Sequence, residues 1–215
     1  MKDKIKTRWY ELIHGHPFLL DAEVDIICKT RDEPKFKHFN DREIQQGAVM
    51  PSLLHGKHIL DCCCGSKMFW FNKSNPAVLF ADIRELETEL CDGRILEVKP
   101  DIIADFRKMP FKDNTFKMVV FDPPHLNKLG QDTWMAQKYG VLFPSWENDI
   151  KEGFDEAMRV LEPFGTLIFK WNEIQITTNK ILQVIGVEPL FGHPSGRHGR
   201  TKWMAFMKGV SCNEA

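Results

Sequence analysis

The sequence lacks the features that mark a membrane or secreted protein. No uninterrupted apolar run approaches the roughly 18 residues that a membrane helix needs. Residues 1–16 carry charge throughout and contain no apolar stretch of the kind found in a signal peptide. Six cysteines are present, but three are adjacent at 62–64, whereas a disulfide framework would space them apart. We therefore expect reduced thiols and a cytoplasmic protein with no membrane partner.

A strong excess of charge of either sign is also missing. The formal net charge is −1, from 29 Lys and Arg against 30 Asp and Glu. This argues against a protein that coats nucleic acid non-specifically, so any nucleic-acid surface must be a local patch. The length of 215 residues fits one main domain, which we place at 55–210. Residues 1–54 are interpreted as an N-terminal extension that serves as a substrate-recognition or cap segment.

Short apolar runs alternate with helical or loop stretches along most of the chain. The runs interpreted as strands are 24–28, 58–62, 78–81, 101–104, 117–121, 165–170 and 201–207. Between the fifth and sixth of these, Ile150, Phe154, Met158 and Leu161 recur at helical spacing, and Ser145 suits the N-cap. Strands alternating with helices predict an α/β fold, in which a mostly parallel sheet carries helices on both faces.

Four of the predicted strands end in an acidic residue. These residues are Asp61, Asp82, Asp105 and Asp122. The carboxyl ends of parallel strands form the edge at which such sheets bind ligands, so the carboxylates are expected to share one crevice. Asp82 follows Asp61 by 21 residues, near the offset at which an acid reaches ribose hydroxyls. Taken singly, each acid is equally well a helix N-cap.

The turn after the strand at 58–62 also indicates which class of ligand the site would bind. It contains Gly65 and Ser66, where backbone can approach a ligand closely. Its acidic character argues against a pyrophosphate cofactor. The absence of a GxGxxG motif after this strand leaves a nicotinamide dehydrogenase without support.

These residues resemble the ordered motifs of class I methyltransferases that use S-adenosylmethionine (SAM). The motifs are DCCCG at 61–65, ADI at 81–83, ADF at 104–106 and FDPPH at 121–125. The last is similar to the (Asp/Asn)-Pro-Pro-aromatic motif of amino-methyltransferases that act on adenine, cytosine or guanine in DNA and RNA. The tail LFGHPSGRHGRTKWMAFMKG is similar to small methyltransferases of bacteriophages and prophages. The resemblance implies a Rossmann-like, mostly parallel seven-stranded sheet with an antiparallel last strand.

The resemblance further implies a SAM site along the carboxyl edge of this sheet. The residues implied to bind the cofactor are Asp61, Cys62, Gly65, Ser66, Lys67, Asp82, Ile83, Asp105 and Phe106. A carboxylate beside SAM pairs with its ammonium and favours the sulfonium, and Asp105 with Phe106 is expected to receive the adenine. Lys67 stands where the family's turn carries a second glycine. It either reaches the SAM carboxylate or marks a differently shaped loop.

The Asp122-Pro123-Pro124-His125 turn is the implied catalytic corner. An exocyclic amine is a weak nucleophile because its lone pair is delocalised into the ring. The resemblance implies that Asp122 and the carbonyl of Pro123 accept hydrogen bonds from it, while the two prolines fix φ. His125 replaces the usual aromatic residue, and it either stacks on or hydrogen-bonds to the base, or is an ordinary surface histidine. A base in a duplex would first have to flip out.

The acceptor is expected to be an amino nitrogen in a DNA or RNA partner. N6 of adenine is the leading choice, although cytosine N4 and guanine N2 would use the same turn. No cysteine lies near the turn, which excludes methylation at carbon 5 of cytosine. The alternatives are methylation of a small molecule or a protein, and a non-catalytic subunit that keeps the fold.

Substrate contacts are expected from the long connection at 126–146, from the end of the strand at 165–170, and from the end of the chain. The candidates are Trp134, Tyr139, Lys170, Trp171, Arg197 and Arg200. Aromatic side chains there suit base stacking and basic ones suit phosphate, as does Lys138. The basic cluster at 197–202 has a plainer interpretation as a solvated turn.

Three further groups receive structural interpretations. Cys62–Cys64 are interpreted as small buried packing groups. The aromatic-rich run at 68–71 is interpreted as core packing, with Phe69 or Trp70 as a further wall of the SAM pocket. His14, His16, Cys28 and His38 lack a CxxC spacing, so no metal site is expected.

Overall fold

The computed structural model of the protein describes residues 51–90, 92–128, 133–196 and 198–210. The predicted strand at 24–28, the histidines and cysteine considered for zinc, and Arg197 lie outside the described residues. Within the described ranges, no helix combines the length and the apolar composition that crossing a membrane requires.

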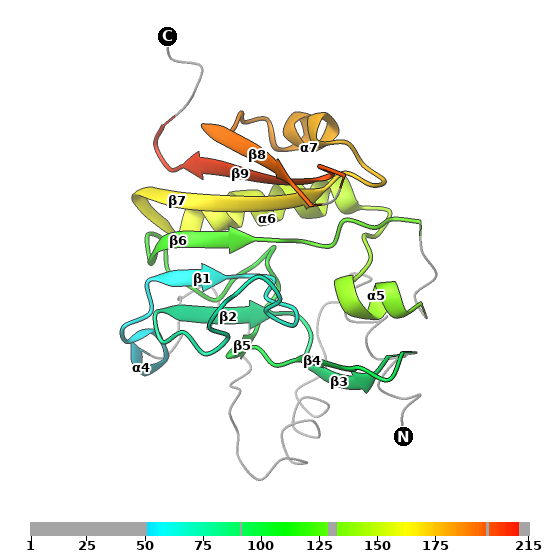
Figure 1. The fold of residues 1–215 in the computed structure, drawn as a ribbon. Coiled ribbons are helices and arrows are strands. Elements are labelled where there is room, and N and C mark those ends of the chain that lie inside the picture. Colours follow the sequence, from blue (N-terminus) through cyan, green and yellow to red (C-terminus); the bar gives the residue numbers. More distant parts are fainter. Residues whose placement is uncertain (1–50, 91, 129–132, 197, 211–215) are drawn as a thin grey trace. The chain divides into compact units, whose positions relative to one another are not determined.

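One sheet of seven strands organises the described residues (Figure 1). The strands are β1 (Ile59–Asp61), β2 (Val78–Asp82), β3 (Leu86–Glu89), β4 (Ile95–Val98), β5 (Ile102–Ile103), β6 (Phe116–Phe121), β7 (Leu161–Asn172), β8 (Phe191–Ser195) and β9 (Thr201–Met207). The helices are α4 (Pro51–Leu54), α5 (Trp134–Tyr139), α6 (Trp146–Val160) and α7 (Thr178–Ile185). The sheet order is β5-β2-β1-β6-β7-β9-β8, and β3 and β4 form a separate antiparallel pair.

The direction of the strands matches the predicted fold class. β5, β2, β1, β6 and β7 pair in parallel, and β9 runs antiparallel to both β7 and β8. The Rossmann-like, mostly parallel seven-stranded sheet with an antiparallel last strand is therefore confirmed.

The strand order reverses at the centre of this sheet. β1 pairs with β2 on one side and with β6 on the other, so the chain builds outward in both directions from β1. Open α/β sheets bind ligands outside the carboxyl ends of the strands at such a switch point. Figure 1 shows α5 and the β3–β4 hairpin on the side to which the arrows of β1, β2 and β6 point. The switch point is flanked by Asp61, which ends β1, and Asp122, which follows β6.

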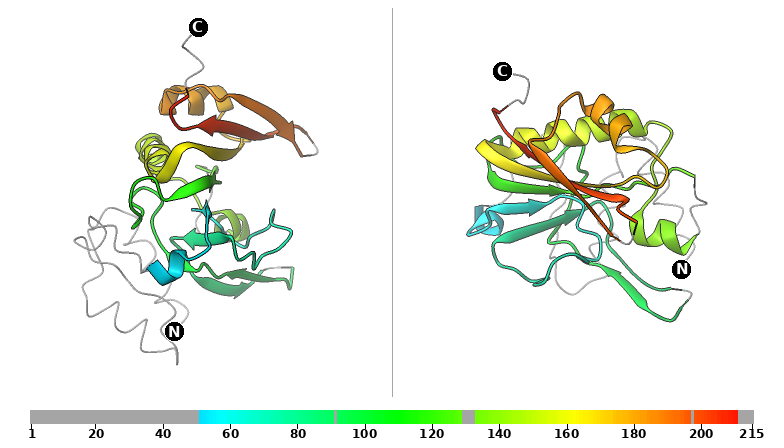
Figure 2. Two further views of the ribbon diagram at one scale, coloured as in Figure 1. Left: turned by 90° about the vertical axis from the view of Figure 1, so that its left-hand side faces the viewer. Right: turned by 45° about the horizontal axis from the view of Figure 1, so that its top comes forward.

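The main core lies on one face of the sheet, against α6 and α7. Leu167, Phe169 and Trp171 alternate along β7 and are wholly buried on this face. Ile150 and Phe154 of α6 pack on them, and α7 adds its own buried side chains to the same cluster. Figure 2 shows α6 on one side of the sheet when the strands are viewed nearly end-on.

The predicted helix between the fifth and sixth strands is confirmed as α6. Ser145 occupies the N-cap position, and Glu147 and Asp149 lie in the first turn. The Ser145 hydroxyl donates to the Asp149 carboxylate at 3.0 Å instead of accepting from a backbone N–H. The strongly amphipathic spacing of its apolar residues explains why this helix was evident from sequence.

The opposite face of β1 and β2 is covered by the loop that follows β1. Val78 and Phe80 point to this side and pack with Cys64, Ile59 and Trp70. The rings of Trp70 and Phe80 meet edge to face with their centres 5.4 Å apart. Among the described residues, the helices packed on the sheet therefore lie on the α6 face, and loop aromatics cover this part of the other face.

The interpretation of residues 68–71 as core packing is wrong for two of the four. Met68 is 60% exposed and Phe71 is fully exposed. Phe69 and Trp70 are half-buried and contact Trp203 and Phe80 respectively. These four consecutive residues follow a turn, so their side chains diverge and only part of the run can face the sheet.

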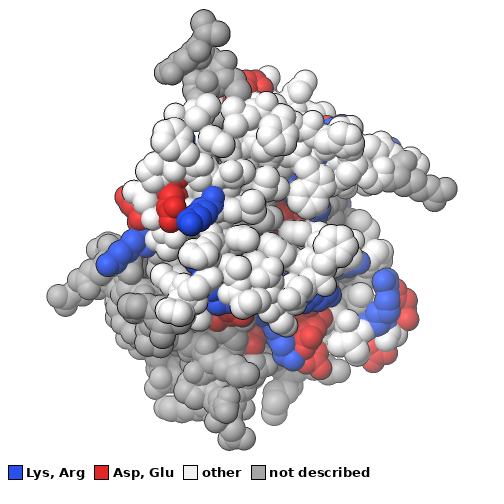
Figure 3. Space-filling view, turned by 60° about the vertical axis from the view of Figure 1, so that its left-hand side comes forward, with Lys and Arg blue, Asp and Glu red and all other residues white. Residues whose placement is uncertain are grey.

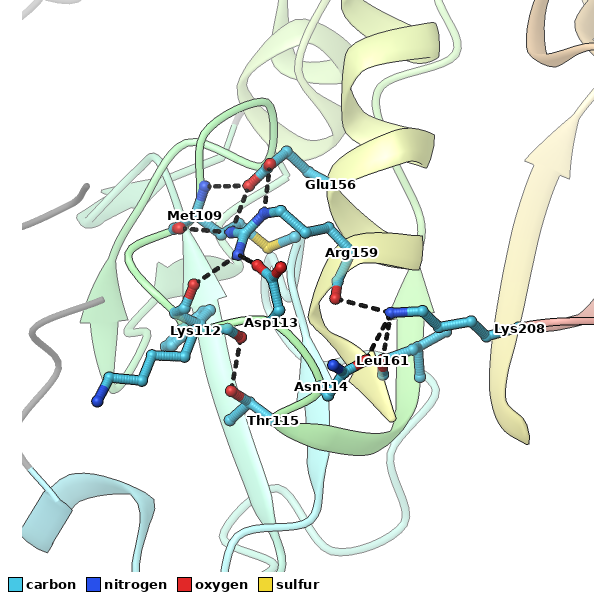
Figure 4. Close-up of polar contacts among 10 residues, drawn as sticks. Met109, Lys112, Asp113, Asn114, Thr115, Glu156, Arg159, Leu161 and Lys208 are labelled. Carbon is cyan, nitrogen blue, oxygen red and sulfur yellow. Dashed lines mark hydrogen bonds and ion pairs between the residues drawn. The ribbon is translucent and has the colours of Figure 1, made fainter. Parts of the chain in front are cut away.

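Arg159, in the last turn of α6, ties the loop before β6 to the helix (Figure 4). Its guanidinium donates to the carbonyls of Met109 at 3.1 Å and Phe111 at 2.8 Å. It also pairs with Glu156, one turn earlier, and with Asp113. One side chain thus donates to two carbonyls and pairs with two carboxylates, and it holds the loop that precedes β6.

We expect Arg159→Ala to lower the free energy of unfolding by about 2–4 kcal/mol, because these acceptors lose their donor. Urea denaturation, monitored by circular dichroism, measures the change in the free energy of unfolding. Lys151→Ala is the control, since Lys151 forms an exposed pair with Asp155 and should alter stability by less than about 0.5 kcal/mol. Equal effects of the two variants would contradict the anchoring role.

Candidate active site

Three of the four strand-end acids gather at the carboxyl edge of the sheet. Asp61 ends β1, Asp82 ends β2 and Asp122 follows β6. The charges of Asp122 and Asp82 both act on Asp61, in addition to its burial. Asp105 instead pairs with Arg107, which also bonds to a carboxylate of α6. Three carboxylates therefore cluster at the switch point, and the fourth belongs to the contact with α6.

Asp61 is completely buried, and the loop after β1 holds its carboxylate. Trp70 Nε1 donates to Oδ2 at 2.7 Å, and the Cys63 N–H donates to Oδ1 at 3.3 Å. Burial raises the pKa of Asp61 to about 7 against these two hydrogen bonds, and the charges of Asp122 and Asp82 add to the rise. Both the protonated and the ionised form of Asp61 are consequently populated near neutral pH.

Asp82 joins the end of β2 to the turn after β1. Its Oδ2 accepts from the Gly65 N–H at 2.9 Å, and its Oδ1 accepts from the N–H and Nε of Arg84 at 2.8 and 3.1 Å. A Cβ on Gly65 would lie 3.7 Å from Arg84 Nη2, and one on Gly140 would lie 3.7 Å from Nη1. The Arg84 guanidinium therefore lies between the turn after β1 and the end of α5.

Arg84 is a site residue that the sequence analysis missed. It lies two residues beyond Asp82, directly after the ADI motif, so its place at the end of β2 was available as a signal. Ile83, between them, is half-buried, as is Ser66 in the turn after β1. The predicted contact of Asp82 with ribose stays a prediction, and both carboxylate oxygens already accept hydrogen bonds from the protein.

Asp122 begins the proline corner and is paired with Lys170. Its Oδ2 accepts a short hydrogen bond from Lys170 Nζ, which comes from near the end of β7. Burial raises the pKa of Asp122, and the Lys170 ammonium opposes that rise. The same ammonium lies 5.3 Å from the centre of the Phe69 ring and 5.7 Å from that of Trp203. Lys170, predicted as a substrate residue, is thus in direct contact with the predicted catalytic acid.

The other side of the corner packs on the end of α5. Gly140 caps this helix with φ of +74°, and a Cβ there would lie 2.9 Å from Pro124 Cγ. Only glycine allows both this backbone conformation and this approach. The contact brings α5 to the corner, with Trp134 42% exposed and Tyr139 36% exposed. Both predicted stacking residues are therefore accessible.

His125 is half-buried in an aromatic group. Its ring centre lies 5.8 Å from that of Tyr139 and 6.3 Å from that of Trp171. Burial, assisted by the charge of Lys170, lowers the pKa of His125 to about 4. The imidazole is therefore neutral at physiological pH, and it offers a flat ring that hydrogen-bonds without carrying charge.

Two predicted site residues pack in the core, and a third is exposed. Trp171 is wholly buried and its indole N–H donates to the Ile176 carbonyl at 2.9 Å, so it belongs to the core and the predicted substrate contact is corrected. Phe106 packs against Phe121, with ring centres 5.3 Å apart, in the core under α6. Arg200 is exposed in the turn between β8 and β9.

The turn after β1 carries the cysteine triplet and Lys67. Cys62 and Cys64 are buried and Cys63 is half-buried, and burial raises the pKa of the Cys63 and Cys64 thiols. This agrees with their interpretation as packing groups, because a protonated thiol is a poor nucleophile. Lys67 adopts φ of +56°, the conformation that a glycine would supply, and its ammonium lies 4.2 Å from the Phe80 ring centre.

The buried acid Asp61 predicts a pH-dependent stability. In the unfolded chain an aspartate titrates near pH ~3.9, so the raised pKa means that this group's favourable contribution is complete below that pH and is lost as pH rises through 7. Asp61→Asn cannot ionise. We compare the free energy of unfolding of this variant with that of the unmodified chain. The difference, variant minus unmodified chain, should rise by on the order of 2 kcal/mol between pH 5 and pH 8.

Urea denaturation at both pH values measures this difference. Asp155→Asn is the control, because Asp155 is an exposed acid on α6 and its replacement should give the same small change at both pH values. A stability difference for Asp61→Asn that is independent of pH would show that Asp61 keeps an ordinary pKa.

Comparison with known proteins gives likeness at the level of structure. No family model and no curated protein matches the sequence. The chain is similar to a TehB-like SAM-dependent methyltransferase from Corynebacterium glutamicum, with 14% identity, a TM-score of 0.44, and coverage of 96% of this chain and 97% of that one. It is also similar to the N-methyltransferase NodS from Bradyrhizobium japonicum, with 12% identity, a TM-score of 0.45, and coverage of 80% and 100%. It is similar as well to a SAM-dependent methyltransferase from Leishmania major, with 18% identity, a TM-score of 0.43, and coverage of 86% of this chain and 77% of that one. The fold assignment above rests on the strand order itself.

Proposed function

We propose that this chain transfers the methyl group of SAM to an exocyclic amino group of a nucleobase in DNA or RNA, with N6 of adenine as the first candidate. One observation carries the proposal. The carboxylates of Asp61, Asp82 and Asp122 cluster at the switch point, and the last of them begins the Asp-Pro-Pro-His corner. This arrangement supports a site for a cation beside an acceptor for an amine.

The charges at the switch point fit a cationic cofactor. Three carboxylates face two cations, Arg84 and Lys170, so the group carries one net negative charge when Asp61 is ionised. SAM would supply one net positive charge and an electrophilic methyl group on its sulfonium. Asp61, Asp82, Gly65 and Ser66 are the residues that would hold it. The adenine contacts assigned to Asp105 and Phe106 stay predictions.

Asp122 has the geometry of an acceptor for an amine N–H. Lys170 bonds to Oδ2, and within the described residues Oδ1 has no hydrogen-bond partner. The ammonium also favours the ionised form of Asp122 in spite of burial. A carboxylate that accepts an amine N–H strengthens that nitrogen as a nucleophile, and the fixed φ of Pro123 holds the neighbouring carbonyl in place.

The surroundings of the corner suit a flat acceptor. His125 is neutral, and Tyr139 and Trp134 present partly exposed rings from α5. Trp171 packs behind His125 and limits its movement. Base rings stack on such surfaces without regard to sequence, so these residues support a nucleobase that has been unstacked.

The decisive assay is methyl transfer by the Asp122→Ala variant. We expect its transfer rate to fall by about 100-fold or more, as when a preorganised group at a reacting centre is removed, while the Kd for SAM changes less than about threefold. The purified chain is incubated with labelled SAM and separate pools of DNA, tRNA and rRNA, and nucleosides are identified by mass spectrometry. Asp155→Ala, an exposed acid on α6, is the matched control and should transfer normally.

The outcomes of this assay separate the alternatives. Normal methyl transfer by Asp122→Ala would show that the active site lies elsewhere. SAM binding with transfer only to a small-molecule or protein panel would replace the nucleobase as acceptor. A chain that binds no SAM would be a non-catalytic module.

The raised pKa of Asp61 predicts how cofactor discrimination changes with pH. The ionised form favours the positive charge of SAM over the neutral sulfur of S-adenosylhomocysteine. We expect the preference for SAM to grow by about threefold or more between pH 6 and pH 8, because Asp61 ionises across that range. Titration calorimetry with both ligands gives the ratio of their Kd values at each pH. In Asp61→Asn this ratio should not change with pH. A flat ratio in the unmodified chain would remove Asp61 from the cofactor site.

A further inference from the structure

A cavity of about 470 Å³ opens between the turn after β1, the β3–β4 hairpin and α5. Its charged lining residues are Lys67, Lys73, Arg94, Lys99, Lys138 and Glu97. Five cations and one carboxylate thus converge on one hollow, in a chain whose net charge is −1. On the face seen in Figure 3, most Lys and Arg side chains lie in the lower half, at the height of β2, β3 and β4 in Figure 1, below a largely uncharged surface.

The positive charges of this cavity are only partly balanced. Arg94 pairs with Asp92, and Lys99 pairs with Glu97. In the part of the chain that the structure describes, Lys67, Lys73 and Lys138 have no ion pair with a carboxylate, and Lys67 and Lys138 lie over aromatic rings. The hydrogen bond from Lys99 lowers the pKa of Glu97, and the charges of Lys67 and Lys73 lower it further. The three lysines therefore supply a surplus of positive charge.

The uncharged lining combines the polar Ser66 and Ser74 with four apolar side chains. Leu90 and Leu96 form a buried floor, while Met68 and Ile95 are 60% and 63% exposed at its rim. A hollow that combines apolar, hydroxyl and cationic side chains suits a ligand that joins flat rings to anionic groups. A simple inorganic anion would leave the apolar part unused.

The cavity adjoins the candidate active site through two shared segments. Gly65 lines it, and the N–H of the same residue bonds to Asp82. Lys138 lies in α5, whose cap Gly140 packs on Pro124 of the corner. A strand of nucleic acid with one base at the corner would therefore pass the cavity with its neighbouring nucleotides.

We propose that this cavity binds the phosphodiester backbone of a single nucleic-acid strand beside the target nucleotide, with Lys67, Lys73 and Lys138 as its phosphate ligands. The inference rests on the proposed function, since it names the part of the substrate that lies outside the acceptor corner. It differs from the basic cluster at 197–202, where Lys202 pairs with Glu173. Phosphate binding is independent of base identity, which permits a test without the methylated base.

The test uses fluorescence anisotropy with the full chain and fluorescein-labelled oligo(dT) and oligo(U), which lack exocyclic amino groups. We expect Lys73→Glu/Lys138→Glu to weaken binding of both probes by about 10-fold or more at 50 mM salt. The milder Lys73→Gln/Lys138→Gln variant should reduce the slope of log K against log salt by about 1.4, the value for two lost contacts to a single strand. Circular dichroism confirms that each variant is folded.

Lys112→Glu/Lys117→Glu is the control with the same change in charge. Both lysines are exposed and precede or begin β6, at the amino edge of the sheet, and Figure 4 shows the Lys112 side chain extending away from its neighbours. This control should bind within about twofold of the unmodified chain. If both double variants lost the same oligonucleotide affinity, the loss would be explained by net charge alone, and the assignment of the cavity would be overturned.

Two further arms separate this inference from the proposed function and from a free ligand. Titration with SAM is run on the same samples. If the chain binds SAM but neither oligonucleotide, only the cavity assignment is overturned. If the chain binds oligonucleotides but no SAM, and Lys73→Glu/Lys138→Glu loses that binding, the cavity assignment is supported and the proposed methyltransferase function is overturned. Inorganic tripolyphosphate that binds as tightly as oligo(dT), and is lost in the same variant, would identify a free polyphosphate as the ligand and overturn the nucleic-acid assignment.

Discussion

Removal of Asp61 from water is the constraint on which the rest of the site depends. A buried carboxylate without partners costs several kcal/mol, so this chain must bring donors to the switch point. Trp70 supplies one to Asp61, while Arg84 and Lys170 serve the neighbouring carboxylates. Each donor comes from a different segment, namely the loop after β1, the segment after β2 and the end of β7. The interactions that satisfy the acids therefore also fix three segments around the switch point.

The same pairing makes the proline corner rigid from two sides. Lys170 holds Asp122 from the sheet, and its ammonium lies near the rings of Phe69 and Trp203. Pro124 meets Gly140 on the other side, which leaves α5 little freedom to move relative to the corner. A reacting group that is fixed before the substrate arrives needs no reorganisation during the reaction, and such preorganisation is the main source of electrostatic catalysis. Under the proposed function, the corner would suit this role because the fold positions the Asp122 carboxylate.

Local patterns predicted the local parts of this molecule, and contacts between distant residues lay beyond them. The amphipathic α6, the core of each long strand and the acids at their ends all follow from short windows of sequence. The pairing of Asp122 with Lys170 spans 48 residues, and nothing near either residue marks the other. Trp171 was assigned to substrate because it lies near a strand end, but neighbouring strand residues face opposite sides, so it cannot share the side of Lys170. The β3–β4 hairpin was missed although Asp92-Gly93 separates two alternating segments, a recognisable turn signal.

Lys67 connects the turn after β1 with the basic cavity. A left-handed backbone costs a residue with a Cβ about 1 kcal/mol, and glycine would adopt it freely. The turn keeps this conformation through a bond from the Lys67 N–H to the Cys64 carbonyl at 2.8 Å, and the ammonium rests over Phe80. The shape of the turn therefore does not explain why lysine stands here. The charge does, because the same side chain lines the cavity that also contains Lys73 and Lys138. Where the sequence departs from the glycine of the family that it resembles, it places a cation between the cluster of carboxylates at the switch point and the surface proposed to hold the nucleic-acid backbone.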